Sequence, residues 1–153
     1  MNKYEQLISE YDDEIIIIEK HFKSKAKGLC SGNKIGINKN IATSTEKACV
    51  LAEELGHHQT TVGNIIDLKD PHNQKQERQA RLWAYNKLIG LMGLIGAYEQ
   101  GCRTRHDVAE YLDVTEEFLQ EAIDCYRAKY GECVTVDSYY IMFIPHLMVG
   151  KII

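Results

Sequence analysis

The stretch that decides the fold is residues 45–58, which reads Thr-Glu-Lys-Ala-Cys-Val-Leu-Ala-Glu-Glu-Leu-Gly-His-His. Thr45 is a possible N-cap and Glu46 supplies an acid in the first turn. The residues that follow are apolar at helical spacing. We therefore expect a helix from about Thr45 to His58.

Three polar residues on this helix have the spacing of a metal site. A catalytic zinc takes three protein ligands, and a helix supplies two of them when they lie four residues apart, as Glu53 and His57 do. Glu54 lies about 100° further round the helix, where a carboxylate can accept a proton from water instead of binding the metal. The spacing predicts Glu53 and His57 as metal ligands and Glu54 as a general base. The alternative is a solvated acidic face, because such a string also occurs by chance.

Two further segments flank this helix. Residues 28–38 contain two short extended stretches around Ser31-Gly32-Asn33, which is typical of a β-hairpin. After the helix, residues 77–84 read Glu-Arg-Gln-Ala-Arg-Leu-Trp-Ala. In this order the segments resemble the ImmA/IrrE family of metallo-endopeptidases, in which a hairpin precedes an H-E-L-G-H helix and an acid follows in the pattern E-x-x-A-x-x-F-A-x-x-L-L-x-P.

The resemblance covers the first two-thirds of the chain well and the rest loosely. It implies a zincin-like α+β fold: a helical core with a small β-hairpin or sheet, followed by a helix-turn-helix-like segment. It also implies that Glu77 is the third metal ligand, with Zn²⁺ as cofactor. Gly90 stands where the family tends to have proline.

One position departs from the family pattern. Glu53 stands where the family has its first metal-binding histidine. A carboxylate can bind zinc, but two anionic ligands would leave the site formally neutral and make the metal a weaker Lewis acid. Manganese is the alternative metal. The departure also leaves open a non-catalytic protein that retains the peptidase fold and binds a regulatory partner.

Four neighbouring residues have more than one interpretation each. His58 lies on another face of the helix, although it could replace Glu53 as a ligand. His72, in an expected loop, could reach the metal, but a solvated loop histidine is simpler. Cys49 could offer a thiolate, but core packing is simpler. Arg81 could orient the carboxylate of the third ligand or stabilise an oxyanion in the transition state, but a surface ion pair explains it as well.

The rest of the chain has helical and extended patterns. We expect a short helix over residues 4–11, and either a buried strand or more helix over 15–18. A long helix is expected from about residue 74 towards 98, with glycines at 90, 93 and 96 that permit close packing or a break. Residues 133–153 are rich in Val, Tyr, Ile and Phe, and we expect them to add edge strands.

Residues 107–119 have the rhythm of a helix-turn-helix, with a turn at Asp113-Val114-Thr115. The second helix begins with acids at Glu116 and Glu117, which a phosphate backbone would repel. We therefore expect no direct contact with nucleic acid. The segment is expected to pack against the core or to offer a docking face.

Composition limits the remaining possibilities. The 153 residues are 44% hydrophobic, which suits a single domain over 1–153, with a peptidase core over about 1–100 and a C-terminal extension over about 101–153. The net charge of -4 gives no general attraction for nucleic acid or membrane. The five cysteines lack C-x-x-C spacing, which excludes a Cys-rich zinc module. No signal peptide or bilayer-spanning stretch is found, so we expect a cytoplasmic location.

The partner is implied by the family resemblance alone. Proteases of this kind, encoded on phages and mobile elements, cleave a helix-turn-helix repressor and so relieve repression. We expect the substrate peptide to lie as an extended strand against the hairpin edge near Lys34–Asn38.

Overall fold

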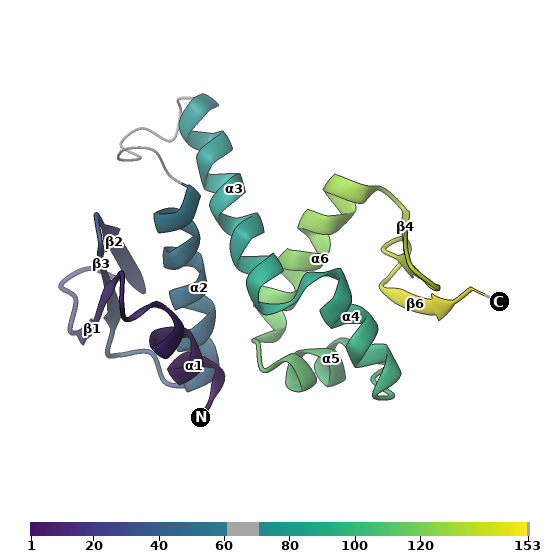
Figure 1. Cartoon of the computed structure of the whole chain (residues 1–153), viewed down its shortest axis with the longest axis horizontal. Coiled ribbons are helices and arrows are strands. Elements are labelled where there is room, and N and C mark those ends of the chain that lie inside the picture. Colours follow the sequence, from purple (N-terminus) through teal and green to yellow (C-terminus); the bar gives the residue numbers. More distant parts are fainter. Residues whose placement is uncertain (61–70, 153) are drawn as a thin grey trace. The chain divides into compact units, whose positions relative to one another are not determined.

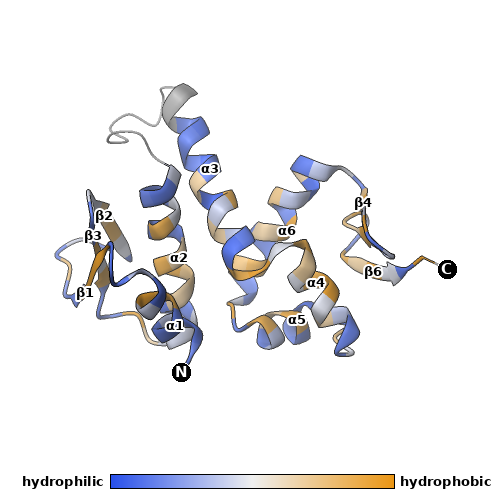
Figure 2. Cartoon of the chain, viewed as in Figure 1, coloured by the Kyte–Doolittle hydropathy of each residue, from blue (hydrophilic) through white to orange (hydrophobic). Residues whose placement is uncertain are grey.

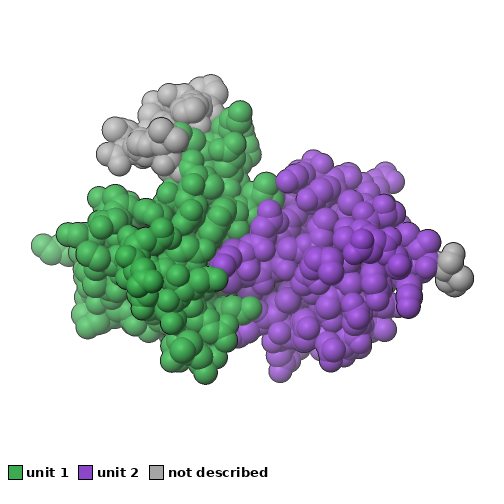
Figure 3. All heavy atoms as spheres, in the orientation of Figure 1, with its two compact units in different colours: residues 1–84 green, residues 85–153 purple. Residues whose placement is uncertain are grey.

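A computed structural model describes residues 1–60 and 71–152, with the side chains of 71–73 excepted. The chain divides into two compact units, Met1–Ala84 (unit 1) and Tyr85–Ile153 (unit 2), shown in different colours in Figure 3. Helices and short strands occur in both units, which confirms the mixed α+β class. A single domain over 1–153, with a core over about 1–100, stays a prediction.

Unit 1 begins with a helix and a small sheet. Helix α1 (Lys3–Tyr11) is followed by strands β1 (Ile16–Lys20), β2 (Gly28–Ser31) and β3 (Lys34–Asn38), as labelled in Figure 1. Strands β2 and β3 pair antiparallel through a turn in which Gly32 has a φ of +60°, which glycine adopts without strain. The predicted hairpin is therefore confirmed.

Strand β1 completes this sheet on the other side of β3. It pairs parallel with β3, so the strand order is β1-β3-β2. Residues 16–20 form a strand, so the helix alternative for 15–18 is wrong, and Figure 2 colours β1 as largely hydrophobic. The expected burial is also wrong, because β1 lies at the edge of the sheet with Ile16 50% and Ile18 47% exposed. The β-branched isoleucines suit this extended conformation.

Helix α2 (Ser44–Thr60) packs against β2, β3 and α1. Its buried residues include Ala48, Cys49, Leu51 and Leu55, which form the core beneath the sheet. The predicted helix over 45–58 is confirmed, with one more residue at its start and two at its end. Cys49 is a core residue, as the simpler of its two interpretations held.

The second helical stretch is two helices rather than one. Helix α3 (Pro71–Leu88) begins three residues before the predicted start, with proline at its first position, where the missing N–H costs nothing. It runs across the boundary between the units. Helix α4 (Gly90–Glu99) begins at Gly90, which has a φ of +66°. The helical stretch is therefore confirmed over most of its length, and of the two roles left open for the glycines the break is found, at Ile89 and Gly90.

Unit 2 continues with the helix pair that the sequence predicts. Helix α5 (Arg105–Leu112) is capped by Thr104, and helix α6 (Glu116–Tyr130) by Thr115, whose hydroxyl accepts a hydrogen bond from the Phe118 backbone N–H at 3.0 Å. Asp113 joins them in the left-handed conformation. This confirms the two helices and the turn between them.

The C-terminal strands form a sheet of their own. Strands β4 (Cys133–Val136), β5 (Tyr139–Met142) and β6 (Met148–Lys151) pair antiparallel in that order. Strands β4 and β6 are the edges of this sheet, which confirms the expected edge strands, and β5 lies between them. No helix in the described part of the chain is long and apolar enough to cross a bilayer.

Candidate metal centre

Helix α2 presents the predicted polar residues near its C-terminal end. Glu53, Glu54 and His57 are all half-buried there, whereas the residues between and before them face the core. Strand β2 lies against the same helix, with Gly28 and Cys30 on its inward face and Leu29 and Ser31 outward. Because strand side chains alternate, β2 forms one wall beside these acids.

A glycine brings α2 and α3 together at this site. A Cβ atom at Gly56 would overlap the backbone carbonyl oxygen of Ala80, so only glycine allows this approach of the two helix backbones. Gly56 is the neighbour of His57, and Ala80 lies one turn after Glu77 on α3. The close crossing of the two helices therefore places Glu77 beside His57.

The Glu77 carboxylate is held between two cations or potential cations. Its Oε2 lies 3.5 Å from Nε2 of His57, and its Oε1 accepts a hydrogen bond from Nε of Arg81 at 3.2 Å. Glu77 is half-buried, and Arg81 is largely exposed. The structure thus brings together two of the three predicted ligands, and Arg81 forms the surface ion pair that was one of its interpretations, with one oxygen of Glu77 while the other faces His57.

Glu54 is the most enclosed acid of the group. A Cβ built on Gly28 would lie 2.9 Å from its Cγ and 3.3 Å from its Oε1, so the β2 backbone passes directly over it. Burial, together with the negative charges of Glu53 and Glu77, raises the pKa of Glu54 from 4.5 to about 7. A carboxyl with a pKa near neutrality can both take up and release a proton at physiological pH.

The donor types at this site fit a divalent metal by their chemistry. One imidazole and surrounding carboxylates are ligands that zinc and manganese take. The geometry is less complete: within residues 1–60 and 71–152, no three His, Cys, Asp or Glu side chains form a group that could hold a metal. His57 and Glu77 are in direct contact, and the charge of Glu53 acts on the Glu54 carboxyl.

The other histidines considered as ligands lie elsewhere. Nδ1 of His58 lies 3.0 Å from the carbonyl oxygen of Gly32, which ties the end of α2 to the hairpin turn. This contact directs the His58 side chain towards the hairpin turn. The structure therefore does not support His58 as a metal ligand in place of Glu53. His72 falls in the first turn of α3 and not in the expected loop, and its side chain lies outside the described residues.

Two residues of the site were not predicted from the sequence. Gly28 leaves room for the Glu54 side chain, and the pKa of the Cys30 thiol is raised by burial and by the Glu54 charge, which places Cys30 beside that carboxyl. The sequence contained part of the information needed to find them, because side chains alternate along a strand and Gly28 and Cys30 therefore share one face of residues 28–31. Nothing in the sequence says which helix that face meets.

The expected peptide-binding edge needs correction. Strand β3 (Lys34–Asn38) is the central strand and pairs with β1 and β2, so its backbone groups are already used. In the described part of the chain, no strand pairs with the outer edge of β2. The strand edge beside Glu54 is therefore that of Gly28–Ser31.

Comparison with protein-family models gives a match to the IrrE N-terminal-like domain, a peptidase family, over residues 14–124. The chain belongs to this family. The match confirms the ImmA/IrrE resemblance and extends from the small sheet through most of α6. Comparison with curated proteins and with solved structures found no match. As an IrrE-like chain, the protein has a metallopeptidase-like fold, and its Glu53 stands in the helix that carries the site.

Proposed function

We propose that this IrrE-like chain is a metal-dependent endopeptidase that acts in the cytoplasm on a helix-turn-helix repressor of a phage or mobile element. The observation that supports it best is the meeting of His57 and Glu77, 3.5 Å apart on two different helices, beside the buried acid Glu54. The repressor as substrate rests on the family resemblance.

In this proposal Glu53, His57 and Glu77 hold Zn²⁺, with Mn²⁺ as the alternative. The bound metal supplies a Lewis acid that polarises the scissile carbonyl and acidifies water. Arg81 keeps the Glu77 carboxylate directed at His57 through its hydrogen bond to the other oxygen. The negative charges of Glu53 and Glu77 both raise the pKa of Glu54, so the three carboxyl groups lie near one another. This local negative charge favours a bound cation.

Glu54 is the proton carrier of the reaction. As a carboxylate it takes a proton from the water whose oxygen attacks the peptide carbonyl, and it then delivers that proton to the leaving amine. One water is consumed, the C–N bond breaks, and a carboxylic acid and an amine are released. Burial raises the pKa of Glu54 in the metal-free protein, and a bound cation would lower it and favour the carboxylate that accepts the proton.

The substrate peptide adds a strand to the outer edge of β2. Backbone hydrogen bonds along an edge strand bind an extended peptide largely without regard to its sequence. Gly28 lies in van der Waals reach of the Glu54 side chain, so a peptide on β2 runs past the general base.

The test is cleavage of a purified helix-turn-helix repressor by the wild type and by Glu54→Gln, each with zinc or manganese, with fragments identified by mass spectrometry. We expect cleavage by the wild type and a rate at least about 100-fold lower for the variant. Glu99→Gln, which removes an exposed acid on α4, is the matched control and should cleave normally. Equal cleavage by the wild type and Glu54→Gln would refute the assignment of Glu54.

A second function is favoured by a specific observation, the glutamate at position 53 together with the two-donor contact described above. In this alternative the chain retains the peptidase fold, binds the repressor and does not cleave it. Calorimetry with the same repressor separates the two: binding without fragments, in the presence of either metal, supports the non-catalytic protein.

A further inference from the structure

Unit 2 contains a pocket of about 710 Å³ that is separate from the candidate metal centre. Its walls come from α4, α5, α6, the segment between α4 and α5, and residues 143–149. All lining residues belong to unit 2, and none of the residues assigned to the metal centre is among them. Its volume falls in the range of pockets that hold small organic molecules.

The floor of this pocket is apolar. Leu94 on α4, Val108 on α5 and Ile123 on α6 are buried and line it, together with the buried ring of Phe143. These side chains belong to four separate segments, so the floor is formed by the packing of the whole unit. An apolar surface of this kind favours the hydrocarbon or aromatic part of a ligand.

The lining is strongly biased towards positive charge. Arg103, Arg105 and Arg127 contribute to it, against the single acid Glu116, and His106 and His146 add two more basic groups. The whole chain has a net charge of -4, so this gathering does not follow from composition. Concentrated like charges in a hollow raise the local potential and attract the opposite charge.

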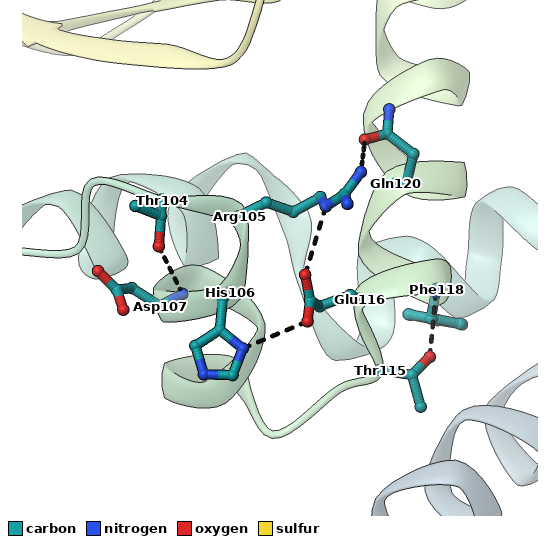
Figure 4. A network of polar contacts seen from close by, with 8 residues as sticks. All are labelled: Thr104, Arg105, His106, Asp107, Thr115, Glu116, Phe118 and Gln120. Carbon is teal, nitrogen blue, oxygen red and sulfur yellow. Dashed lines mark hydrogen bonds and ion pairs between the residues drawn. The ribbon is translucent and has the colours of Figure 1, made fainter.

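Contacts within the unit hold the arginines in place. Arg103 lies over the Tyr98 ring at 4.5 Å and donates to the carbonyl oxygens of Tyr98 and Cys102 at 3.2 and 2.8 Å. Figure 4 shows Arg105 reaching from α5 to Gln120 and Glu116 on α6, at 2.9 and 3.5 Å. A guanidinium held in one orientation loses less entropy when it binds an anion.

Acids beside these basic groups offset part of the positive charge, and Glu110 lies 3.5 Å from Nε2 of His106. Glu116 is shared between Arg105 and His106, the latter at 3.2 Å, as Figure 4 shows. Arg127 has Asp124 at 3.3 Å on its own helix. Each guanidinium has five N–H donors, so one carboxylate uses only part of what Arg105 or Arg127 can donate.

We propose that this pocket binds a small organic anion, with its apolar body on the floor and its carboxylate or phosphate head against Arg105 and Arg127. Neither an apolar molecule nor a bare inorganic anion matches both parts of the lining. The site is independent of the function proposed for the metal centre and stands if that function fails.

The test uses 1-anilinonaphthalene-8-sulfonate as an anionic aromatic probe and N-phenyl-1-naphthylamine as its uncharged counterpart, with the full chain. We expect the anionic probe to bind one site per chain, and tighter than the uncharged one. Arg105→Gln and Arg127→Gln should each weaken its binding about tenfold, since each removes a charge-assisted contact. Lys129→Gln, which removes an exposed cation from α6 outside the pocket, should leave it unchanged.

The uncharged probe checks that the variants fold, because its weak binding should be equal in all of them. Octanoate and octyl phosphate then compete for the site, and the better competitor identifies the head group. Equal binding of the two probes, an equal effect of Lys129→Gln, or failure of both competitors would overturn the proposal.

Discussion

At the scale of single residues, the Glu54 carboxyl makes stability depend on pH. Its pKa is 4.5 when exposed and about 7 in the fold, so the folded state favours the protonated form. This contribution is fully present below pH 4.5 and is lost as the pH rises through about 7. A shift of this size corresponds to about 3 kcal/mol.

Glu54→Gln should therefore stabilise the metal-free protein at pH 8, because glutamine mimics the protonated acid. We expect a gain of up to about 3 kcal/mol in the free energy of unfolding at pH 8 and almost none at pH 4.5. Urea unfolding in the presence of chelator at the two pH values measures it. A gain of the same size at both pH values would mean that Glu54 does not titrate as described.

Substitution of Glu53 by histidine tests whether residue 53 is a metal ligand. Glu53→His replaces an anionic ligand by a neutral one, which leaves a zinc site formally +1 and the metal a stronger Lewis acid. We expect the rate of repressor cleavage with zinc to rise about tenfold. Glu53→Gln, which also removes the charge but is a poor ligand, should not show this gain. A zinc-loaded Glu53→His protein no faster than the wild type would contradict the proposed role.

At the scale of elements, the crossing of α2 and α3 depends on Gly56. Alanine usually stabilises a helix relative to glycine, but here its Cβ would meet the Ala80 carbonyl oxygen. We expect Gly56→Ala to lower the free energy of unfolding by about 1–3 kcal/mol, as overpacking does, and to weaken metal binding because Glu77 is moved from His57. Thermal unfolding and zinc titration measure the two effects.

Gly96 is the matched control for that substitution. It also lies inside a helix, but a Cβ there would meet the Tyr111 hydroxyl at 3.4 Å, an ordinary contact. We expect Gly96→Ala to be neutral or slightly stabilising. If Gly56→Ala were tolerated equally well, the close helix approach would not be what positions Glu77.

Local sequence patterns predicted most helices and strands, but they did not predict which strands pair with one another. The turn triplet at Gly32 and the caps at Thr104 and Thr115 are signals within a few residues, which is why the hairpin and the two later helices could be predicted. The parallel pairing of β1 with β3 joins segments far apart in the chain. That pairing made β3 central, so the expected peptide edge was on the wrong strand.

The residues of the site were likewise predictable from local sequence patterns, whereas the contacts between them were not. Helical spacing predicted Glu53, Glu54 and His57 as site residues, and a family pattern predicted Glu77, but only the fold shows that His57 and Glu77 are in contact. The approach of β2 to Glu54 depends on packing between elements, so Gly28 and Cys30 were missed. The charged pocket of unit 2 was missed for the same reason, since its arginines come from three separate segments.

At the scale of the whole molecule, charge argues against binding of nucleic acid. The net charge is -4, and the first turn of α6 carries Glu116 and Glu117 where a recognition helix would meet phosphate. We expect no salt-dependent binding to duplex DNA by fluorescence anisotropy between about 50 and 200 mM salt. Affinity that falls steeply over this range would reveal a DNA-binding role for the helix pair.

Elemental analysis of protein purified without chelator shows whether His57 belongs to a metal centre. The comparison is between the wild type, His57→Ala and, as a matched control, His58→Ala, whose imidazole contacts the hairpin turn. We expect about one equivalent of zinc or manganese in the wild type and in His58→Ala, and none in His57→Ala. Absence of metal from all three proteins, even after zinc is added, would contradict this assignment and favour the non-catalytic, partner-binding protein.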